Sequence, residues 1–412
     1  MRMEFCEITH YYMSCKEEIY QQLMSEMDLS REISDEEMQD LIDDMVISKG
    51  REYGLSLLER QEMARELFYA IRRLDILQEL IEDEEITEIM INGMGRIFLE
   101  KKGHMLPWDK KFSSKEKLED VIQQIVSKCN RVVNEASPIV DARLENGSRV
   151  NVVLAPLALN GPIVTIRRFP EQPIRMEDLI AYGSISREVA QMLEKLVIAG
   201  YNIMVSGGTG SGKTTFLNAL SQYIPKTERI ITIEDSAELQ LQGIENLVRL
   251  ETRNANAEGT KEINIRDLIR TSLRMRPDRI IVGEVRGGEA FDMLQALNTG
   301  HDGSLSTGHA NSARDMLSRL ETMVLMGMEL PLSAIRRQIA SGVDIIIHLG
   351  RLRDRSRRVL EIVEVVGMEQ DEIVTQPLYC FQEEGELNGR LQGSMCKINE
   401  LVHQEKLMAA GI

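Results

Sequence analysis

The chain has 412 residues and a formal net charge of −17; 43% of its residues are hydrophobic and 28% are charged. This length and composition predict a globular protein of two or three domains. They argue against a transmembrane or secreted protein, because the sequence has no apolar run of about 18 residues and no basic N-terminal segment leading into an apolar one. The five cysteines include no C-x-x-C pair, so we expect reduced thiols in the cytoplasm and no zinc site.

The acidic charge is concentrated near the N-terminus. Residues 1–85 contain 9 Lys and Arg against 23 Asp and Glu, whereas the rest of the chain has 40 against 43. Neither part has the basic surface with which a protein neutralises many phosphates of DNA or RNA. We therefore expect no nucleic acid among its partners.

Residues 1–84 are predicted to form an acidic helical extension. Ser34 and Ser56 are each followed three residues later by Glu, which is the spacing of a capping box at a helix N-terminus. After the second box, apolar residues recur at helical spacing from Ala64 to Leu74. This pattern is typical of a small helical bundle with a solvated acidic face.

Residues 85–169 are predicted to form a smaller α+β N-terminal domain. Short extended runs begin near residue 88, and 114–130 has the spacing of an amphipathic helix. Two more extended runs flank Asn146-Gly147, the dipeptide favoured in a two-residue type I′ hairpin. Pro170 and Pro173 then interrupt the pattern, so we expect an interdomain linker at 170–184.

Residues 185–412 are predicted to form an α/β domain. Short apolar strands alternate with amphipathic helices, which indicates a mostly parallel sheet covered by helices. Helices are expected at 312–326 and 331–341, followed by a strand at 343–349 and two extended runs after the basic turn 351–358. We interpret the five arginines of that turn as a solvated hairpin end.

A phosphate-binding loop opens this domain. The sequence SGGTGSGKT at 206–214 contains the pattern G-x-x-x-x-G-K-[ST] between an apolar strand and a helix. Glycines let backbone N–H groups surround phosphates, and the helix N-terminus adds positive potential. We expect Lys213 to reach the β- and γ-phosphates and Thr214 to bind Mg²⁺. The predicted ATP-binding residues are Gly207, Gly208, Thr209, Gly210, Ser211, Gly212, Lys213, Thr214 and Thr215.

Carboxylates at the ends of two predicted strands complete this site. Glu234 and Asp235 end one strand, and Glu284 ends another. Because the carboxyl ends of parallel strands meet at one edge of a sheet, these acids are expected beside the phosphate loop. We assign Glu284 to the attacking water, and Glu234 and Asp235 to the Mg²⁺ ion.

Two histidines join the predicted catalytic residues. His301 and His309 lie in a stretch rich in Gly, Ser and Thr, and His309 follows a predicted strand on the side that carries Glu284. Either imidazole is a candidate to hydrogen-bond a γ-phosphate and to respond to its loss.

Several motifs together resemble one family. The segments GGTGSGKTT, IEDSAELQL and RMRPDRIIVGEVRGGEAFDMLQALNTGHDGSLSTGHANS, preceded by SPIVDARLENGSRVN, resemble the type II/IV secretion ATPases. Within that family they are most similar to the CpaF branch, which powers assembly of Flp/Tad pili. The likeness extends over about 85–382. The four-cysteine metal motif of the type II assembly ATPases is missing, which favours the CpaF branch.

The resemblance implies a RecA-like P-loop domain that hydrolyses Mg-ATP within a homo-hexameric ring. It also implies a cytoplasmic motor that docks on inner-membrane pilus or secretion platform proteins and is peripheral to the membrane, not inserted in it. The family's Asp box would fall on 234–238, its Walker B motif on 280–284 and its His box on 301–309.

The resemblance also implies roles for residues outside the P-loop domain. Arg143 and Arg149, with Arg167, match the arginines of the N-terminal domain that complete the nucleotide site. Gly308 departs from the pattern, since a bulkier residue is expected before His309.

Two other functions remain open from the sequence. A nucleic-acid translocase on the same RecA-like core, as in conjugative DNA transfer, predicts an ATPase stimulated by DNA and a basic channel. A small-molecule kinase predicts a monomer with an acceptor pocket.

Overall fold

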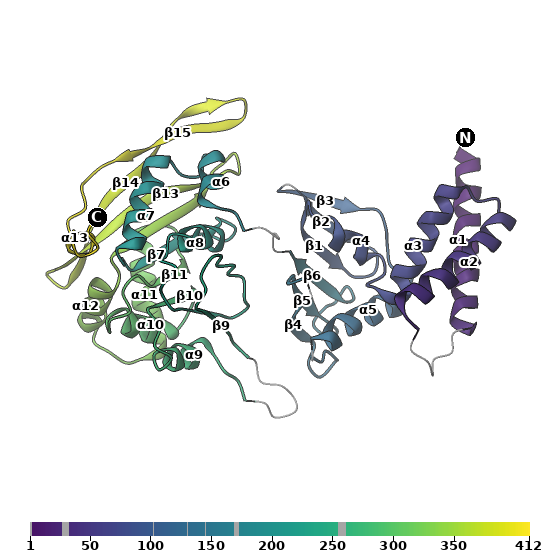
Figure 1. Ribbon diagram of the computed structural model, residues 1–412, viewed down its shortest axis with the longest axis horizontal. Coiled ribbons are helices and arrows are strands. Elements are labelled where there is room, and N and C mark those ends of the chain that lie inside the picture. Colours follow the sequence, from purple (N-terminus) through teal and green to yellow (C-terminus); the bar gives the residue numbers. More distant parts are fainter. Residues whose placement is uncertain are drawn as a thin grey trace. The chain divides into compact units, whose positions relative to one another are not determined.

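The computed structural model describes residues 2–26, 33–101, 103–129, 131–144, 146–168, 173–253 and 261–412. The chain divides into two compact units, Met1–Pro170 and Glu171–Ile412, each with its own hydrophobic core (Figure 1). Across the described ranges, no helix combines the length and the apolar character needed to cross a bilayer.

The first unit begins with helices, as predicted. They are α1 (Arg2–Glu26), α2 (Asp35–Glu52) and α3 (Leu57–Arg72). Both predicted capping boxes are present: each serine hydroxyl accepts the N–H of the glutamate three residues on, whose carboxylate accepts the serine N–H. Buried apolar side chains of the three helices form a core of their own, which includes Ile19, Ile42 and Leu67.

A six-stranded antiparallel sheet completes the first unit. Its order is β3-β2-β1-β6-β5-β4. Two helices pack with it, because Leu77 and Leu80 of α4 and Leu118 and Ile122 of α5 share its core. Thus α4 belongs to the core of the sheet, although its residues fall within the predicted extension. The bounds are α4 Leu77–Glu82, β1 Ile86–Asn92, β2 Ile97–Lys101, β3 His104–Trp108, α5 Lys115–Lys128, β4 Ile139–Arg143, β5 Arg149–Val153 and β6 Ile163–Arg167.

The second unit is built on a nine-stranded sheet in the order β15-β14-β13-β12-β7-β11-β10-β8-β9. Strands β12, β7, β11, β10, β8 and β9 run parallel, whereas β13, β14 and β15 are added to the sheet by antiparallel pairings. The strands are β7 Ile203–Gly207, β8 Ile230–Glu234, β9 Leu247–Glu251, β10 Arg279–Val285, β11 Leu305–His309, β12 Ile345–Arg351, β13 Arg357–Glu369, β14 Glu372–Leu387 and β15 Arg390–Lys397. This sheet confirms the predicted α/β class.

Helices cover both faces of this sheet (Figure 1). Successive strand residues face opposite sides, so Ile203 and Val205 pack with α6–α8, whereas Met204 packs with α9–α12. The helices are α6 Met176–Ala181, α7 Arg187–Ile198, α8 Lys213–Ser221, α9 Ile265–Ser272, α10 Glu289–Leu297, α11 Ala313–Gly327, α12 Leu332–Gly342 and α13 Glu405–Ala409. Helices α11 and α12 confirm the helices predicted at 312–326 and 331–341.

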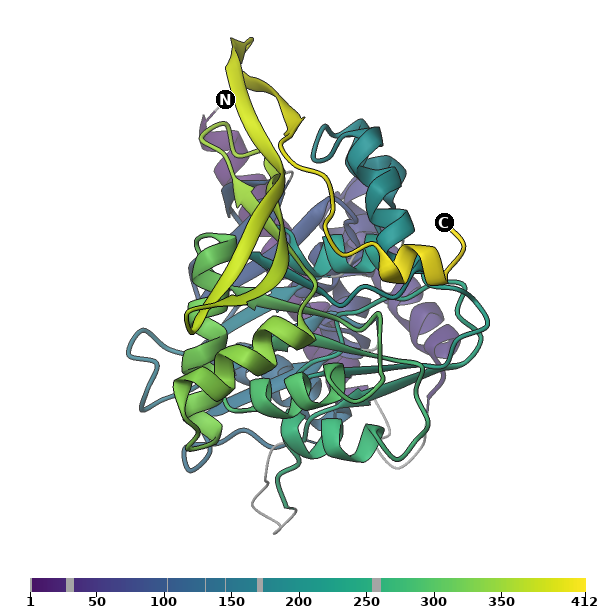
Figure 2. The ribbon, with the colours of Figure 1, turned by 90° about the vertical axis from the view of Figure 1, so that its left-hand side faces the viewer.

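Three elements of the second unit, α6, β9 and β15, were not predicted from the sequence. Helix α6 lies inside the stretch predicted to be a linker, and it forms because Met176 and Leu179 are buried in the core of the second unit. Strands β9 and β15 lie at the two edges of the large sheet. Figure 2 shows β14 and β15 extending from this unit as a two-stranded ribbon.

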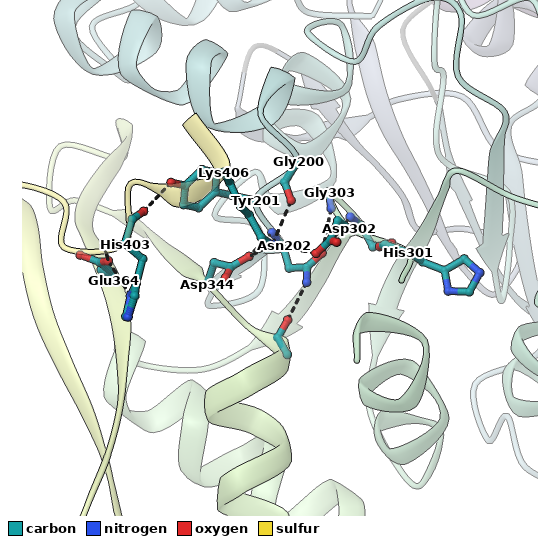
Figure 3. A network of polar contacts seen from close by, with 12 residues as sticks. Gly200, Tyr201, Asn202, His301, Asp302, Gly303, Asp344, Glu364, His403 and Lys406 are labelled. Carbon is teal, nitrogen blue, oxygen red and sulfur yellow. Dashed lines mark hydrogen bonds and ion pairs between the residues drawn. The ribbon is translucent and has the colours of Figure 1, made fainter. Parts of the chain in front are cut away.

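The C-terminal segment is held at the amino ends of the parallel strands (Figure 3). Lys406 Nζ of α13 lies 2.8 Å from Asp302 Oδ1 and 2.7 Å from Asp344 Oδ2. Burial opposes the charge of this ammonium, but the two carboxylates outweigh it and raise the pKa of Lys406. The buried carboxylate of Glu364 accepts the backbone N–H of His403 at 2.8 Å. The amino edge of the sheet is thus closed by the chain's own tail.

Candidate nucleotide site

The phosphate loop lies at the opposite, carboxyl edge of the same sheet, between β7 and α8. Gly210 and Gly212 have φ values of +70° and +93°, a region that favours glycine. At Gly207 a side chain has no room, because a Cβ there would lie 2.5 Å from the carbonyl oxygen of Leu349. Residues 208–210 are exposed, so the tip of the loop is open to solvent.

Lys213 is folded back over this loop. Its ammonium donates to the carbonyl oxygens of Gly207 and Gly208, both at 3.1 Å, and the residue is 8% exposed. The Ser211 hydroxyl donates to the same Gly208 carbonyl at 2.9 Å. Phosphate oxygens are the acceptors that the sequence pattern predicts for Lys213. Nucleotide binding therefore requires Lys213 to exchange backbone carbonyls for phosphate oxygens.

His309 connects Lys213 to Glu284. Lys213 Nζ lies 3.2 Å from His309 Nδ1, and His309 Nε2 lies 2.7 Å from Glu284 Oε1. The sheet creates this arrangement, because β11 lies between β7 and β10. Three residues predicted separately from the sequence thus meet in one chain of contacts.

The contacts determine which imidazole nitrogen carries the proton. An ammonium can only donate, so Nδ1 accepts from Lys213 and the proton resides on Nε2. Glu284 Oε1 is buried and, without a proton on Nε2, would have no hydrogen-bond partner among the described residues. Burial lowers the pKa of His309, as do Lys213 and Arg286, and together they outweigh the opposing effect of Glu284. His309 is therefore neutral near pH 7 and donates to Glu284.

Arg286 is a site residue that the sequence analysis missed. Its Nη2 lies 2.6 Å from Glu284 Oε2, and its Nη1 lies 3.9 Å from Asp235 Oδ2. Glu284 thus has a neutral donor at one oxygen and a cation at the other. The sequence signal that could have pointed to Arg286 is its position two residues after Glu284, the acidic end of a predicted strand.

Glu234 lies beside these residues but is bound differently. Its Oε1 accepts the backbone N–H groups of Glu238 and Leu239, both at 2.8 Å. Its Oε2 is buried with no hydrogen-bond partner in the part of the chain that the structure describes. The side chain fills the space over Gly283, where a Cβ would lie 2.8 Å from Glu234 Cγ. Burial raises the pKa of Glu234 to about 7, against the opposing hydrogen bonds.

These acids and Thr214 supply the chemistry that a Mg²⁺ ion needs. Thr214 and Thr215 lie half-buried in the first turn of α8, next to the loop. Carboxylate and hydroxyl oxygens are suitable Mg²⁺ ligands, and the unpartnered Glu234 Oε2 leaves one such oxygen available. The donor set therefore fits the predicted metal, with Thr214, Asp235 and Glu234 as its candidate ligands.

His301 lies elsewhere. It precedes β11, whereas His309 ends that strand, and β11 runs parallel to β7 with Leu305 opposite Ile203. About 13 Å of strand separates the two edges of the sheet at β11. His301 Nδ1 instead lies 3.2 Å from the Ala296 carbonyl, at the edge where the C-terminal segment docks (Figure 3). The prediction that His301 contacts a γ-phosphate is wrong for the loop of its own chain.

Gly308 has a packing role. A Cβ at this position would lie 2.6 Å from Met316 Cε and 3.1 Å from Met204 Cε, so these side chains fill the space that a bulkier residue would need. His309 is oriented by its bonds to Lys213 and Glu284.

The predicted arginines of the first unit lie in one row of its sheet. Arg143 is opposite Arg149, and Arg149 is opposite Arg167. Directly opposed residues share a face, so the three arginine side chains leave the same face of the sheet from neighbouring positions. Arg149 Nη2 lies 3.4 Å from Asp141 Oδ1, and Arg143 Nε donates to the Gly147 carbonyl at 3.1 Å. The predicted proximity of Arg143 and Arg149 is confirmed.

The hairpin that carries them is longer than predicted. Leu144 N donates to the Ser148 carbonyl at 2.9 Å, so three residues lie between the last paired positions. Gly147 has a φ of +86°, which suits the last position of a three-residue loop. The predicted two-residue turn is therefore wrong.

Comparison with known proteins decides the family. The model for type II/IV secretion system proteins matches residues 72–409. The chain belongs to the type II/IV secretion system protein family. Together with the phosphate loop and its acids, this makes it an ATPase, as predicted.

Curated members of this family show what the chain is similar to. An uncharacterised protein of Methanocaldococcus jannaschii is 38% identical over 62% of this chain, a match that spans 36% of that protein. A putative conjugal transfer protein of Mycobacterium tuberculosis is 34% identical over 70% of this chain and 83% of its own length. The type IV secretion system protein PtlH of Bordetella pertussis is 34% identical over 70% of this chain and 93% of its own length. The assignment to the CpaF branch stays a prediction.

Solved structures support the fold of this secretion-family chain. The ATPase DotB of Legionella pneumophila superposes with a TM-score of 0.50 and 21% identity, covering 72% of this chain and 80% of DotB. DotB of Yersinia pseudotuberculosis superposes with a TM-score of 0.51 and 18% identity, covering 72% of this chain and 79% of that DotB. The RecA-like P-loop domain with a smaller α+β domain and an N-terminal helical extension is confirmed.

The raised pKa of Glu234 predicts a pH-dependent stability. Because its folded pKa of about 7 exceeds the unfolded value of 4.5, the protein loses stability as pH rises from about 4.5 to 7. Glu234→Gln removes this titration. Between pH 5 and pH 8 the parent should lose about 2.5 kcal/mol more unfolding free energy than the variant, measured with urea.

Glu251→Gln is the matched control, because Glu251 is exposed on the neighbouring strand opposite Glu234. It should keep the pH dependence of the parent. An unchanged pH dependence in Glu234→Gln would contradict the burial argument.

Proposed function

We propose that this ATPase is a homo-hexameric motor that couples Mg-ATP hydrolysis to pilus assembly or protein secretion. The observation that carries the proposal is the chain of contacts from Lys213 through His309 to Glu284 in a member of the secretion family. The motif resemblance to the CpaF branch favours Flp/Tad pilus assembly. The motor would act at the cytoplasmic face of the inner membrane, docked on platform proteins.

The residues of the site have distinct proposed roles. Glu284 orients the attacking water and accepts its proton, with His309 and Arg286 fixing the carboxylate. Thr214, Asp235 and Glu234 would hold Mg²⁺, which neutralises phosphate charge when bound. Lys213 donates to the phosphates in place of the loop carbonyls.

Lys213 also links nucleotide binding to His309. When the ammonium turns to phosphate, His309 Nδ1 loses its donor, and the imidazole is left held by Glu284. Bound nucleotide would therefore change the hydrogen bonding of His309, and release of the nucleotide would reverse the change. This exchange supports a role for His309 in coupling hydrolysis to motion.

We further propose that Arg143 and Arg149 serve a nucleotide site of the ring, with Arg167 beside them. Their gathering on one sheet face supports this role, because several guanidinium groups can neutralise the charge of a γ-phosphate. Such an arginine contributes about 10³–10⁵ in rate in other phosphate-loop enzymes.

Transport of nucleic acid is the second candidate function. It is favoured by the name of the conjugal transfer relative from Mycobacterium tuberculosis. The acidic charge of the chain argues against it, since DNA binding requires clustered Lys and Arg.

Alanine substitution tests the arginine row. Arg143→Ala and Arg149→Ala should each lower ATP turnover tenfold or more, with ATP affinity largely kept. Arg96→Ala, an exposed arginine outside the row, should match the parent. Mixing either variant with Lys213→Ala subunits should restore turnover if the arginines act across a subunit interface. Parent rates in both single variants would show that the row has no part in hydrolysis.

Glu284→Gln tests the proposed function. The variant should bind ATP but turn it over at least tenfold more slowly, since an amide cannot take a proton from water. A chromosomal Glu284→Gln strain should then lose surface pili or the secreted protein, and DNA should not stimulate the parent enzyme.

Loss of ATP binding together with turnover would make Glu284 a structural residue. Stimulation of the parent by DNA, with pili and secretion intact in the variant strain, would favour the nucleic-acid translocase.

A further inference from the structure

The basic turn 351–358 lies against the phosphate loop. Strand β12 pairs with β7 as far as Leu349 opposite Gly207, which is the first residue of the loop pattern. The turn follows two residues later and leads into β13, where Arg357 is opposite Arg351. Register alone therefore brings this turn to the loop, on the side of β7 away from β11.

Arg357 contacts the loop directly. Its Nε donates to the Gly210 carbonyl at 2.9 Å, and a Cβ on Gly212 would lie 3.6 Å from Arg357 Cδ. The side chain thus runs along the exposed part of the loop. Arg357 is exposed, as a solvated hairpin end implies, but it also contacts the phosphate loop, which the sequence analysis did not predict.

The neighbouring arginines of the turn have other contacts. Arg353 Nη1 lies 2.8 Å from Glu383 Oε2, and Arg358 donates to the Leu391 carbonyl at 2.6 Å. Both interactions support the β14–β15 ribbon. Within the described residues, the terminal amino groups of Arg357 make no hydrogen bond or ion pair, so four N–H donors beside the loop remain available.

Arg357 and Glu284 lie on opposite sides of the loop. The strand order has β12 on one side of β7, and β11 and β10 on the other. A γ-phosphate must lie near Glu284 for water to attack it, so the rest of the nucleotide extends away from β10. The exposed part of the loop at Gly210, beside Arg357, lies in that direction.

We propose that Arg357 is a nucleotide-binding residue of the ATPase site. Its Nε fixes the Gly210 carbonyl, and its terminal amino groups donate to oxygens of the α- and β-phosphates. Because ATP and ADP share these phosphates, the contact strengthens binding of both and does not change during hydrolysis. The proposal depends on ATPase activity and is independent of which machine the motor drives.

Nucleotide binding by purified full-length protein tests this role. Arg357→Ala should weaken ADP and ATP binding by about tenfold or more and raise KM for ATP to match. The kcat at saturating ATP should stay within about threefold of the parent. Arg357→Lys, which keeps one charged donor without the fork, should recover part of the affinity.

Arg355→Ala is the matched control, since Arg355 is an exposed residue of the same turn. It should bind ADP like the parent. The rise in melting temperature on adding ADP, taken against each variant's own melt, keeps the test valid if a variant is less stable. Parent-like ADP affinity in Arg357→Ala would overturn the proposal. A lower kcat with an unchanged KM would also overturn the proposal, because Arg357 would then act on the transition state and not on nucleotide binding.

Discussion

The ammonium of Lys213 is the group on which the nucleotide site depends. It contacts two loop carbonyls and the imidazole of His309 at once. Because Lys213 donates to Nδ1 of that imidazole, the imidazole carries its proton on Nε2 and donates it in a hydrogen bond to Glu284. One charge therefore contacts the loop backbone and fixes the tautomer of His309, which in turn donates to Glu284.

The sheet gives this charge its surroundings. The parallel strands β7, β11 and β10 are buried, and they end side by side, so the loop, His309 and Glu284 share one edge. Residues without side chains permit the close approach: Gly207 faces the Leu349 carbonyl, and Gly283 gives room to Glu234. At the other edge the C-terminal segment closes the sheet with its own ion pairs. The nucleotide site thus lies at the carboxyl ends of the parallel strands, and the C-terminal segment docks at their amino ends.

Much of this arrangement could be predicted from the sequence. The loop pattern fixes its own backbone by glycine content, and the rule for parallel strand ends correctly grouped Glu234, Glu284 and His309 near Lys213. The same rule places His301 at the opposite edge of the sheet, because His301 precedes the strand that His309 ends.

The remaining errors concern contacts that depend on strand order. Arg286 has a local signal, its position two residues after the acidic end of a strand, whereas nothing local distinguishes Arg357 from other charged surface residues. Arg357 reaches the loop because β12 returns beside β7, a pairing between residues more than 140 positions apart in the chain. The length of the Asn146-Gly147 hairpin was wrong because the dipeptide fits turns of more than one length.

Nitrogen-15 NMR of histidine-labelled protein tests the central claim most directly, with His309→Gln used to assign the signal. Burial and the charge of Lys213 should keep His309 neutral from pH 6.5 to pH 8, and its contacts with Lys213 and Glu284 should keep the proton on Nε2. A nonhydrolysable ATP analogue should then shift the Nδ1 signal, because Lys213 leaves it for phosphate. An imidazolium at pH 7, or a proton on Nδ1, would contradict the account.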